Sequence, residues 1–149
     1  MTSTAEARVL LVEDNPDDVD LTKLAFRLNR IRAELVVARD GAEALEYLYS
    51  TGSRSGHDPI TPALILLDLK LPRMNGLEVL RRLRSDERTR SIPVVILTSS
   101  AEDRDYQEVA RIGAELYVRK PVDFVEFRDL TRHLAVSWLG HAAEPEGAP

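Results

Sequence analysis

Four short apolar runs, each closed by a polar or charged side chain, constrain the fold of this chain more than any other feature of its sequence. Runs this short are typical of strands that a parallel sheet buries on both faces. The closing residues then emerge at the carboxyl edge of the sheet, where α/β proteins place their ligands. The runs with their closing residues are Val9–Val12 with Glu13 and Asp14, Leu64–Leu67 with Asp68, Val94–Leu97 with Thr98, and Leu116–Val118 with nearby Lys120.

Segments with apolar residues three and four positions apart separate these runs and predict helices. One helix is expected from about Asp17 to Arg30, followed by a further strand at Leu35–Ala38. Two more are expected at Ala42–Tyr49 and after Asn75-Gly76. The residues expected to face inward on these three helices are Leu21, Leu24, Ala25 and Leu28, then Leu45 and Leu48, then Leu77, Leu80 and Leu83.

Capping residues mark the last two expected helices. Ser100 can cap a helix that carries Tyr106, Val109 and Ala110, and Gly113 suits its left-handed C-terminal position. Asp123, with Glu126 three residues later, forms the start of the final helix. Its large apolar residues at helical spacing are Phe124, Phe127, Leu130, Leu134 and Trp138.

The segments outside this pattern bound the domain. Residues 1–7 and 140–149 are expected to be disordered, so that 8–139 form one domain with no effector domain after it. Ser50–Pro62 contains two glycines and two prolines, which predicts a long surface loop. We favour a tolerated insertion over a functional loop here.

Composition excludes several classes of function. The net charge of −5 argues against nonspecific nucleic-acid binding as the main activity, and no apolar run approaches the roughly 20 residues of a membrane span. The chain contains no cysteine, which excludes thiolate chemistry and makes the cytoplasm the expected compartment. Its three histidines, His57, His133 and His141, do not share a metal-ligand spacing.

The alternation of five strands with five helices predicts a doubly wound α/β fold with a parallel sheet. The flavodoxin-like strand order 2-1-3-4-5 is the natural candidate. That order brings Glu13, Asp14 and Asp68 together, with Thr98 and Lys120 arriving from the other side.

Such a cluster supports phosphoryl chemistry. Converging carboxylates raise one another's pKa or hold a cation, and oxygen ligands without histidine or thiolate select a hard ion such as Mg²⁺. An aspartate beside that ion can attack phosphorus and form an acyl phosphate, while an ammonium and a hydroxyl contact the phosphoryl oxygens. Taken singly, Asp14 is better explained as a turn residue and Lys120 as an exposed loop residue. The convergence of all five groups at one edge favours the site.

With these residues in view, the chain resembles the receiver domain of two-component response regulators over roughly Arg8 to Leu139. The resemblance implies that Asp68 accepts a phosphoryl group from a sensor histidine kinase and that the protein is a signalling protein, not an enzyme beyond its own phosphorylation and dephosphorylation. It implies a Mg²⁺ site formed by Glu13, Asp14, Asp68 and the backbone carbonyl of Lys70. It also implies that Lys120 pairs with the phosphate, with Thr98 and Tyr117 as switch residues.

The sequences of Val12–Asp18 and Thr98–Asp103, together with the long loop, are similar to those of stand-alone regulators paired with phytochrome kinases. This similarity implies a bacteriophytochrome-type kinase as donor and a homodimer, and we expect output through the face of the fourth helix, fifth strand and fifth helix. Lys70, two residues after the acceptor, departs from many relatives and can bias acyl-phosphate hydrolysis. A phosphate shuttle and a non-phosphorylated pseudo-receiver stay open. An aspartate-nucleophile phosphatase would need a second aspartate at position 70.

Overall fold

A computed structural model describes residues 7–99 and 103–140 of the chain. Within these residues five strands and five α-helices alternate, with one short 3-10 helix, η1, in the long loop. Their bounds are β1 Ala7–Val12, α1 Pro16–Leu28, β2 Ala33–Ala38, α2 Gly41–Tyr49, η1 Gly52–Arg54, β3 Leu64–Leu67, α3 Gly76–Ser85, β4 Val94–Thr98, α4 Asp103–Ile112, β5 Leu116–Arg119 and α5 Phe124–Trp138. The Ser100 cap and most of the two expected disordered ends lie outside the described residues.

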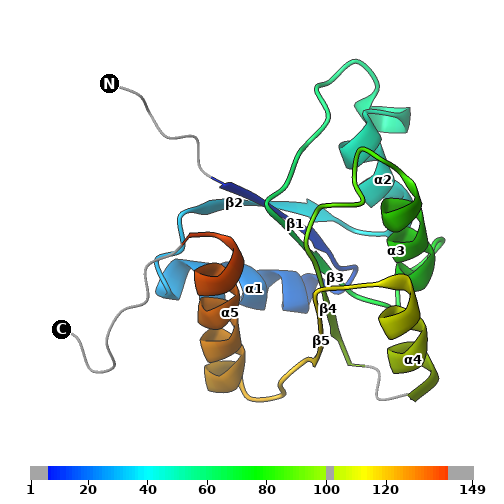
Figure 1. Cartoon of the computed structure of the whole chain (residues 1–149). Helices are drawn as coiled ribbons and strands as arrows, with labels where there is room; N and C mark the ends of the chain where they lie inside the picture. The colour runs from blue at the N-terminus through cyan, green and yellow to red at the C-terminus, as the bar shows by residue number, and fades with distance from the viewer. Residues whose placement is uncertain (1–6, 100–102, 141–149) are drawn as a thin grey trace, which may run out of the picture.

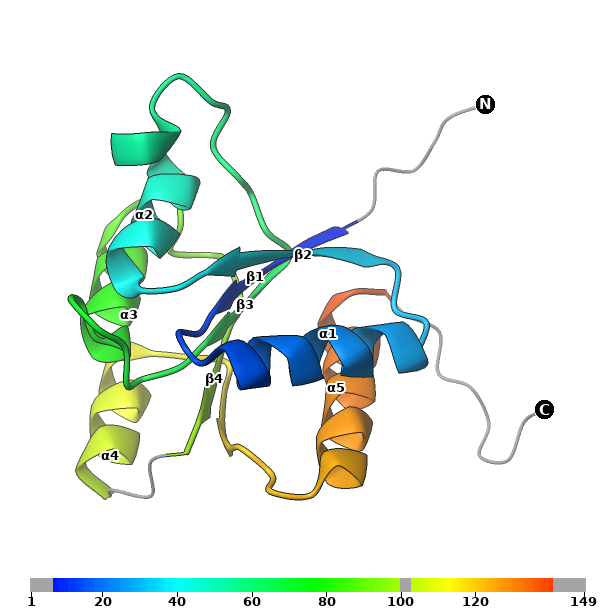
Figure 2. The same cartoon turned by 180° about the vertical axis from the view of Figure 1, so that it is seen from behind.

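The strands form one parallel sheet in the order β2-β1-β3-β4-β5, which confirms the expected flavodoxin-like topology. Helices α1 and α5 cover one face of the sheet, and α2, α3 and α4 cover the other (Figures 1 and 2). No helix among the described residues is long and apolar enough to cross a membrane.

Alternate residues of the central strands supply the two cores, because successive side chains of a strand point to opposite faces. Leu10 and Val12 of β1 pack with the α2–α4 layer, whereas Val9 and Leu11 pack with the α1–α5 layer. The edge strand β5 is only half buried, and its Leu116 is 39% exposed. The best-buried strands are thus the central ones, and two of them, β1 and β3, are followed directly by Glu13 and Asp68.

The expected inner face of α1 is wrong in part. Leu21 and Leu28 are exposed, at 42% and 47%, while the buried residues of α1 are Val19, Thr22, Ala25 and Phe26. A pattern built on leucines misses this face because it includes Thr22, whose hydroxyl donates to the backbone carbonyl of Asp18 at 2.7 Å and is thereby satisfied inside the protein.

The long loop packs back against α2. Ile60 is buried and its N–H donates to the carbonyl of Tyr47 at 3.0 Å. The Arg54 guanidinium lies 4.6 Å from the centre of the Tyr47 ring, and the Ser53 hydroxyl donates to Glu46 at 2.6 Å. These contacts fix the loop on the side of the molecule formed by α2 and α3, at the opposite end of α2 from the polar strand ends (Figure 1).

Candidate functional site

Asp68 follows β3 at the centre of the carboxyl edge. Its N–H donates to the carbonyl of Val12 at 3.1 Å, which continues the pairing of β3 with β1 by one residue. The residue is only 7% exposed, and its Oδ1 accepts from the N–H of Lys70 at 3.2 Å. Asp68 thus presents its carboxylate at the sheet edge from a backbone that is hydrogen-bonded to β1.

Glu13 and Asp14 follow β1 on the neighbouring strand. The register pairs Val12 with Leu67, so Glu13 and Asp68 are the next residues on adjacent strands. Carboxylate oxygens of Glu13, Asp14 and Asp68 all lie within 4.8 Å of one another, with Glu13 and Asp68 buried and Asp14 exposed. Three carboxylates at this spacing, one open to solvent, fit a hard dication that keeps several of its waters.

The carboxyl of Glu13 is the most deeply buried of these three and has two hydrogen-bond donors. It accepts from the N–H of Asn15 at 3.1 Å and from the Lys120 ammonium at 2.5 Å. Burial raises the pKa of Glu13 above its ordinary value, although Lys120 and the Asn15 N–H act in the opposite direction. A cation beside Glu13 would compensate for that desolvation.

Lys120 reaches the same edge from β5. Its N–H donates to the carbonyl of Thr98 at 2.7 Å, and its side chain is 16% exposed. The ammonium nitrogen lies 2.8 Å from Asp18 Oδ2 and 3.5 Å from Asp68 Oδ2, in addition to its bond with Glu13. Burial lowers the pKa of Lys120, but the bonds to Asp18 and Glu13 outweigh it and raise that pKa above the ordinary value, which favours the ammonium form. The adjacent Arg119 is exposed, as alternation along the strand predicts.

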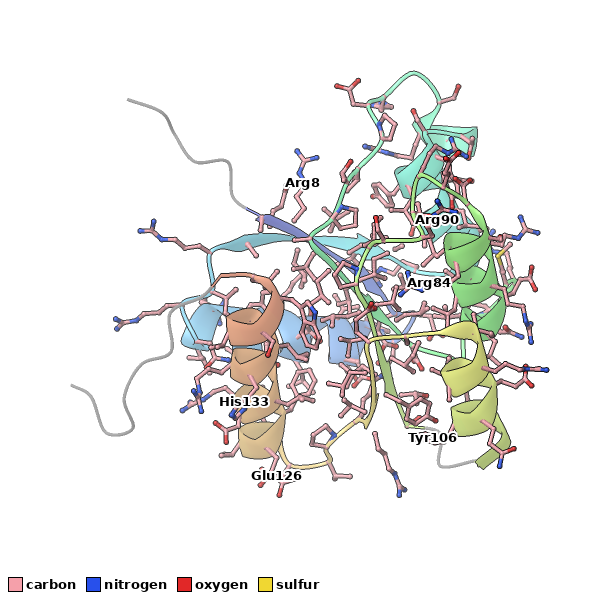
Figure 3. All side chains as sticks on the ribbon, in the orientation of Figure 1. Arg8, Arg84, Arg90, Tyr106, Glu126 and His133 are labelled. Atoms are coloured by element: carbon pink, nitrogen blue, oxygen red, sulfur yellow. The ribbon has the colours of Figure 1, made fainter. Side chains whose placement is uncertain are left out.

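Thr98 and Tyr117 lie on adjacent strands beside this cluster. Thr98 ends β4 and is fully buried. The Tyr117 ring packs edge-on against Tyr106 of α4, with ring centroids 5.3 Å apart at 80°. Tyr106 itself is 57% exposed on the side of α4 that faces β5 (Figure 3). The two residues expected to act as switches thus connect the sheet edge to the α4–β5 surface.

The loop after Asp68 is clamped from three sides. The Gly76 N–H donates to the Leu69 carbonyl at 2.9 Å, and Gly41 lies so close that a Cβ there would be 2.5 Å from the Met74 carbonyl oxygen. Arg73, in the left-handed region at φ 66°, forms an ion pair with the buried Asp40 at the start of α2. The clamp fixes the backbone around Lys70, whose side chain is exposed.

A cavity of about 60 Å³ lies beside Asp68, between α1 and the segment after β5. Its walls are mainly apolar and include Leu21, Val122 and Phe124. The charged residues on its lining are Glu13, Asp18, Asp68 and Lys120. The Asp68 carboxylate therefore lies where a cluster of charged side chains meets an apolar rim.

Comparison with known proteins identifies this arrangement. The response regulator receiver domain family matches residues 9–132 of the chain. The chain belongs to that family. Its fold is the one that the sequence predicted, and its membership of the receiver family argues against an aspartate-nucleophile phosphatase.

The chain is similar to several regulatory proteins over most of their own length. The chain is 36% identical to the probable methanogenesis regulatory protein FilR2 of Methanothrix harundinacea, over 92% of this chain and 86% of FilR2. It is 31% identical to the response regulator Rcp1 of Synechocystis, over 88% of each chain. The crystal structure of the phosphorylated cyanobacterial phytochrome response regulator RcpA superposes with a TM-score of 0.84 and 33% identity, covering 95% of this chain and 100% of RcpA. These relatives support the stand-alone, phytochrome-associated subgroup.

Asp18 is the residue of this receiver domain that sequence reasoning missed. It lies in the first turn of α1 and reaches across to Lys120, which is 102 positions away. The sequence held one signal for this residue: Asn15-Pro16 is followed by two acidic residues, and a single one suffices to interact favourably with the helix N-terminus. Which of the two turns toward the site depends on the rotation of α1 against the sheet, and the same rotation buries Thr22.

Proposed function

We propose that this receiver domain accepts a phosphoryl group on Asp68 from a histidine kinase in a Mg²⁺-dependent reaction and then signals through contacts with other proteins. The observation that carries the proposal is the position of the Asp68 carboxylate. It lies within 4.8 Å of two further carboxylates and 3.5 Å from the Lys120 ammonium.

The reaction transfers phosphorus from nitrogen to oxygen. An Asp68 carboxylate oxygen forms the new bond to phosphorus, the phosphorus–nitrogen bond of the kinase phosphohistidine breaks, and the imidazole leaves with the bonding electron pair. Glu13, Asp14, Asp68 and the Lys70 carbonyl would hold Mg²⁺, which supplies charge neutralisation for the phosphoryl oxygens. Three acidic side chains around an anionic substrate otherwise repel it, which is the reason that the reaction needs the metal.

Lys120 and Thr98 contribute the remaining contacts to the phosphoryl group. The ammonium already lies beside Asp68, and Thr98 ends the neighbouring strand β4. A Thr98 hydroxyl that turns toward the phosphoryl oxygen leaves space that the Tyr117 ring can occupy, which changes its packing against Tyr106. The phosphate thereby shifts the population of two states of the α4–β5 surface.

The output surface is proposed to be a homodimer contact on α4, β5 and α5. A groove there is lined by Tyr106, Val109, Leu116 and Tyr117, and Tyr106 and Leu116 are exposed. The five large apolar residues of α5 do not strengthen this proposal. Phe127 and Leu134 are buried, and Phe124, Leu130 and Trp138 pack against the core. The groove between α4 and β5 carries the argument instead.

The donor is proposed to be a phytochrome-type histidine kinase. Rcp1 and RcpA, which are similar to this chain over nearly its whole length, are cyanobacterial regulators, and RcpA is described as a phytochrome response regulator. Exposed apolar side chains beside the acceptor, Leu21 on α1 and Val122 before α5, offer a kinase a surface next to Asp68. In the alternative role, a phosphate shuttle, the phosphoryl group would pass from Asp68 to a histidine of a second protein.

Phosphoryl transfer to the purified protein tests the proposal. With acetyl phosphate and Mg²⁺ the parent should gain one phosphoryl group by intact-protein mass spectrometry, and Asp68→Asn should gain none. Asp20→Asn, the same change at an exposed position of α1, should be labelled like the parent. Labelling of Asp68→Asn at the parent level would exclude Asp68 as the acceptor, and a parent that is never labelled would leave a pseudo-receiver.

A further inference from the structure

We infer that Asp18 is a positioning residue that holds the Lys120 ammonium on the α1 side of the site and so competes with a phosphoryl group on Asp68 for that ammonium. The inference rests on the proposed function, because it concerns the same acceptor site. It assigns a role to a residue outside the set of acceptor, metal and switch residues described above.

The distances show where the ammonium is bound. Lys120 Nζ lies 2.5 Å from Glu13 Oε1 and 2.8 Å from Asp18 Oδ2, both within hydrogen-bonding distance. The nearest oxygen of Asp68 is at 3.5 Å, which is an ion-pair contact and not a hydrogen bond. An ammonium has three N–H donors, and here two of them are directed to residues other than the acceptor.

The position of Asp18 is fixed by the helix on which it lies. Asn15 caps α1 by accepting from the N–H of Asp17 at 2.9 Å, and Pro16 occupies the first turn. The backbone carbonyl of Asp18 accepts from the buried Thr22 hydroxyl at 2.7 Å. These bonds hold the Asp18 backbone against the sheet edge, so its carboxylate meets Lys120 with little conformational freedom to lose.

Burial makes this ion pair stronger than one on an open surface. The side chains of Lys120 and Asp18 are 16% and 34% exposed, so water screens their attraction only in part. Burial is the largest effect on the pKa of Lys120 and lowers it, and of the effects that raise this pKa the hydrogen bond that the ammonium donates to Asp18 is the largest. Together with Glu13, Asp18 therefore holds the ammonium outside hydrogen-bonding distance of Asp68.

The three carboxylates around Lys120 have different roles in the reaction. Asp68 forms the bond to phosphorus, and Glu13 belongs to the group that fits a dication. Asp18 has neither role, so its bond to Lys120 can be exchanged for a bond to a phosphoryl oxygen without loss of the metal or the acceptor. The strength of the Asp18–Lys120 pair then sets part of the cost of that exchange.

Beryllofluoride, which forms a phosphoryl-like adduct with a carboxylate, is a suitable equilibrium probe for this competition. At saturating Mg²⁺, Asp18→Asn should bind it about two- to fivefold more tightly than the parent, as expected for the loss of a competing, partly exposed ion pair. Asp17→Asn removes the same charge from the same helical turn, where the side chain is exposed, and is the matched control. Asp18→Glu should return the affinity toward that of the parent, since it restores a carboxylate.

The outcomes separate this inference from the proposed function. Equal affinities of Asp18→Asn and Asp17→Asn, or weaker binding by Asp18→Asn, would overturn the role of Asp18 while the parent still binds the probe. A parent that neither binds beryllofluoride nor gains a phosphoryl group would overturn the proposed function itself. Thermal unfolding of each variant shows that a change in affinity comes from a folded protein, because Asn at position 18 retains the backbone bond to Thr22.

Discussion

The first residue of α3, Gly76, lies directly against the backbone of Asp68. A Cβ on Gly76 would come within 2.2 Å of the Asp68 carbonyl oxygen and 2.7 Å of the Leu69 Cα. Backbone atoms cannot yield as a flexible side chain can, so the start of α3 and the loop after Asp68 depend on the absence of a side chain at this position. Asp68 is thereby packed between the end of its own strand and the helix that follows.

Gly76→Ala should therefore destabilise the protein, by about 1–3 kcal/mol as for an overpacked site. Helix propensity alone predicts the opposite sign, because alanine is favoured over glycine by up to ~1 kcal/mol in a helix. The free energy of unfolding in urea measures the effect, with the exposed Ser85→Ala at the other end of α3 as a near-neutral control. If the Gly76→Ala protein is as stable as the parent, the loop after Asp68 can shift to make room for the added Cβ, which would contradict this account.

Arg84 should contribute far more to stability than its neighbours on α3. It is largely buried and donates to the carbonyls of Gly113, Ile92 and Arg90 at 2.8, 2.9 and 3.1 Å and to Glu115 at 2.9 Å. Figure 3 shows Arg84 and Arg90 along the inner side of α3 and the segment that follows it. Arg84→Ala removes the side-chain donor from these three carbonyls, while Glu115 keeps the N–H of Val94 at 2.7 Å, and it should cost about 2–4 kcal/mol in chemical denaturation.

Arg82→Ala is the matched control for Arg84. Arg82 forms an exposed pair with Glu78, four residues earlier on the same helix, at 3.2 Å. Such pairs contribute little, so its loss should change the free energy of unfolding by no more than about 0.5 kcal/mol. Equal effects of the two substitutions would contradict the role given to the buried network.

Asp14→Asn should weaken Mg²⁺ binding by about tenfold, equivalent to ~1.4 kcal/mol, because it removes one of the three clustered charges. Stability without metal should not fall, since like-charge repulsion is relieved. Titration with Mg²⁺ followed by calorimetry measures the affinity, and Asp20→Asn on the exposed face of α1 controls for net charge. Identical affinities of the two variants would remove Asp14 from the metal site.

The ion pair between Arg73 and Asp40 should contribute to the stability of the folded protein at acid pH. Burial raises the pKa of Asp40, but the Glu43 N–H and Arg73 outweigh it and hold that pKa below its ordinary value of 3.8. The stabilisation is therefore present above the unfolded pKa and is lost as the pH falls toward the folded pKa. Arg73→Gln should begin to lose stability at a higher pH than the parent in acid titrations followed by circular dichroism. Arg39→Gln, at an exposed position next to Asp40, should follow the parent curve.

Sedimentation tests the proposed dimer surface. If α4, β5 and α5 form the contact, the parent should show a larger dimer fraction with beryllofluoride and Mg²⁺ than without them. Leu116→Asp should reduce that fraction, because it places a charge on the exposed apolar residue of β5. Leu28→Asp makes the same change on α1 and should have no effect. A monomer in all conditions at high micromolar concentration would leave a monomeric phosphate shuttle.

The sequence by itself determined the order of the elements and the five polar groups at one sheet edge. Both depend on local patterns: a short, fully apolar run such as Leu64–Leu67 is typical of a buried strand, and parallel strands bring their closing residues to one edge. Asp68 and Lys120 could be identified in this way because each follows directly from where its strand ends. The capping residues Asn15 and Asn75 are equally local.

Only the tertiary structure decided which faces and partners the remaining residues take. The inner face of α1 depends on how the helix rotates against the sheet, which buries Thr22 and leaves Leu28 exposed. That rotation directs Asp18 to Lys120, and the packing of two loops brings Arg73 to Asp40. These contacts join residues far apart in the chain, and the free energy that selects them comes from packing over the whole molecule, which no local pattern contains.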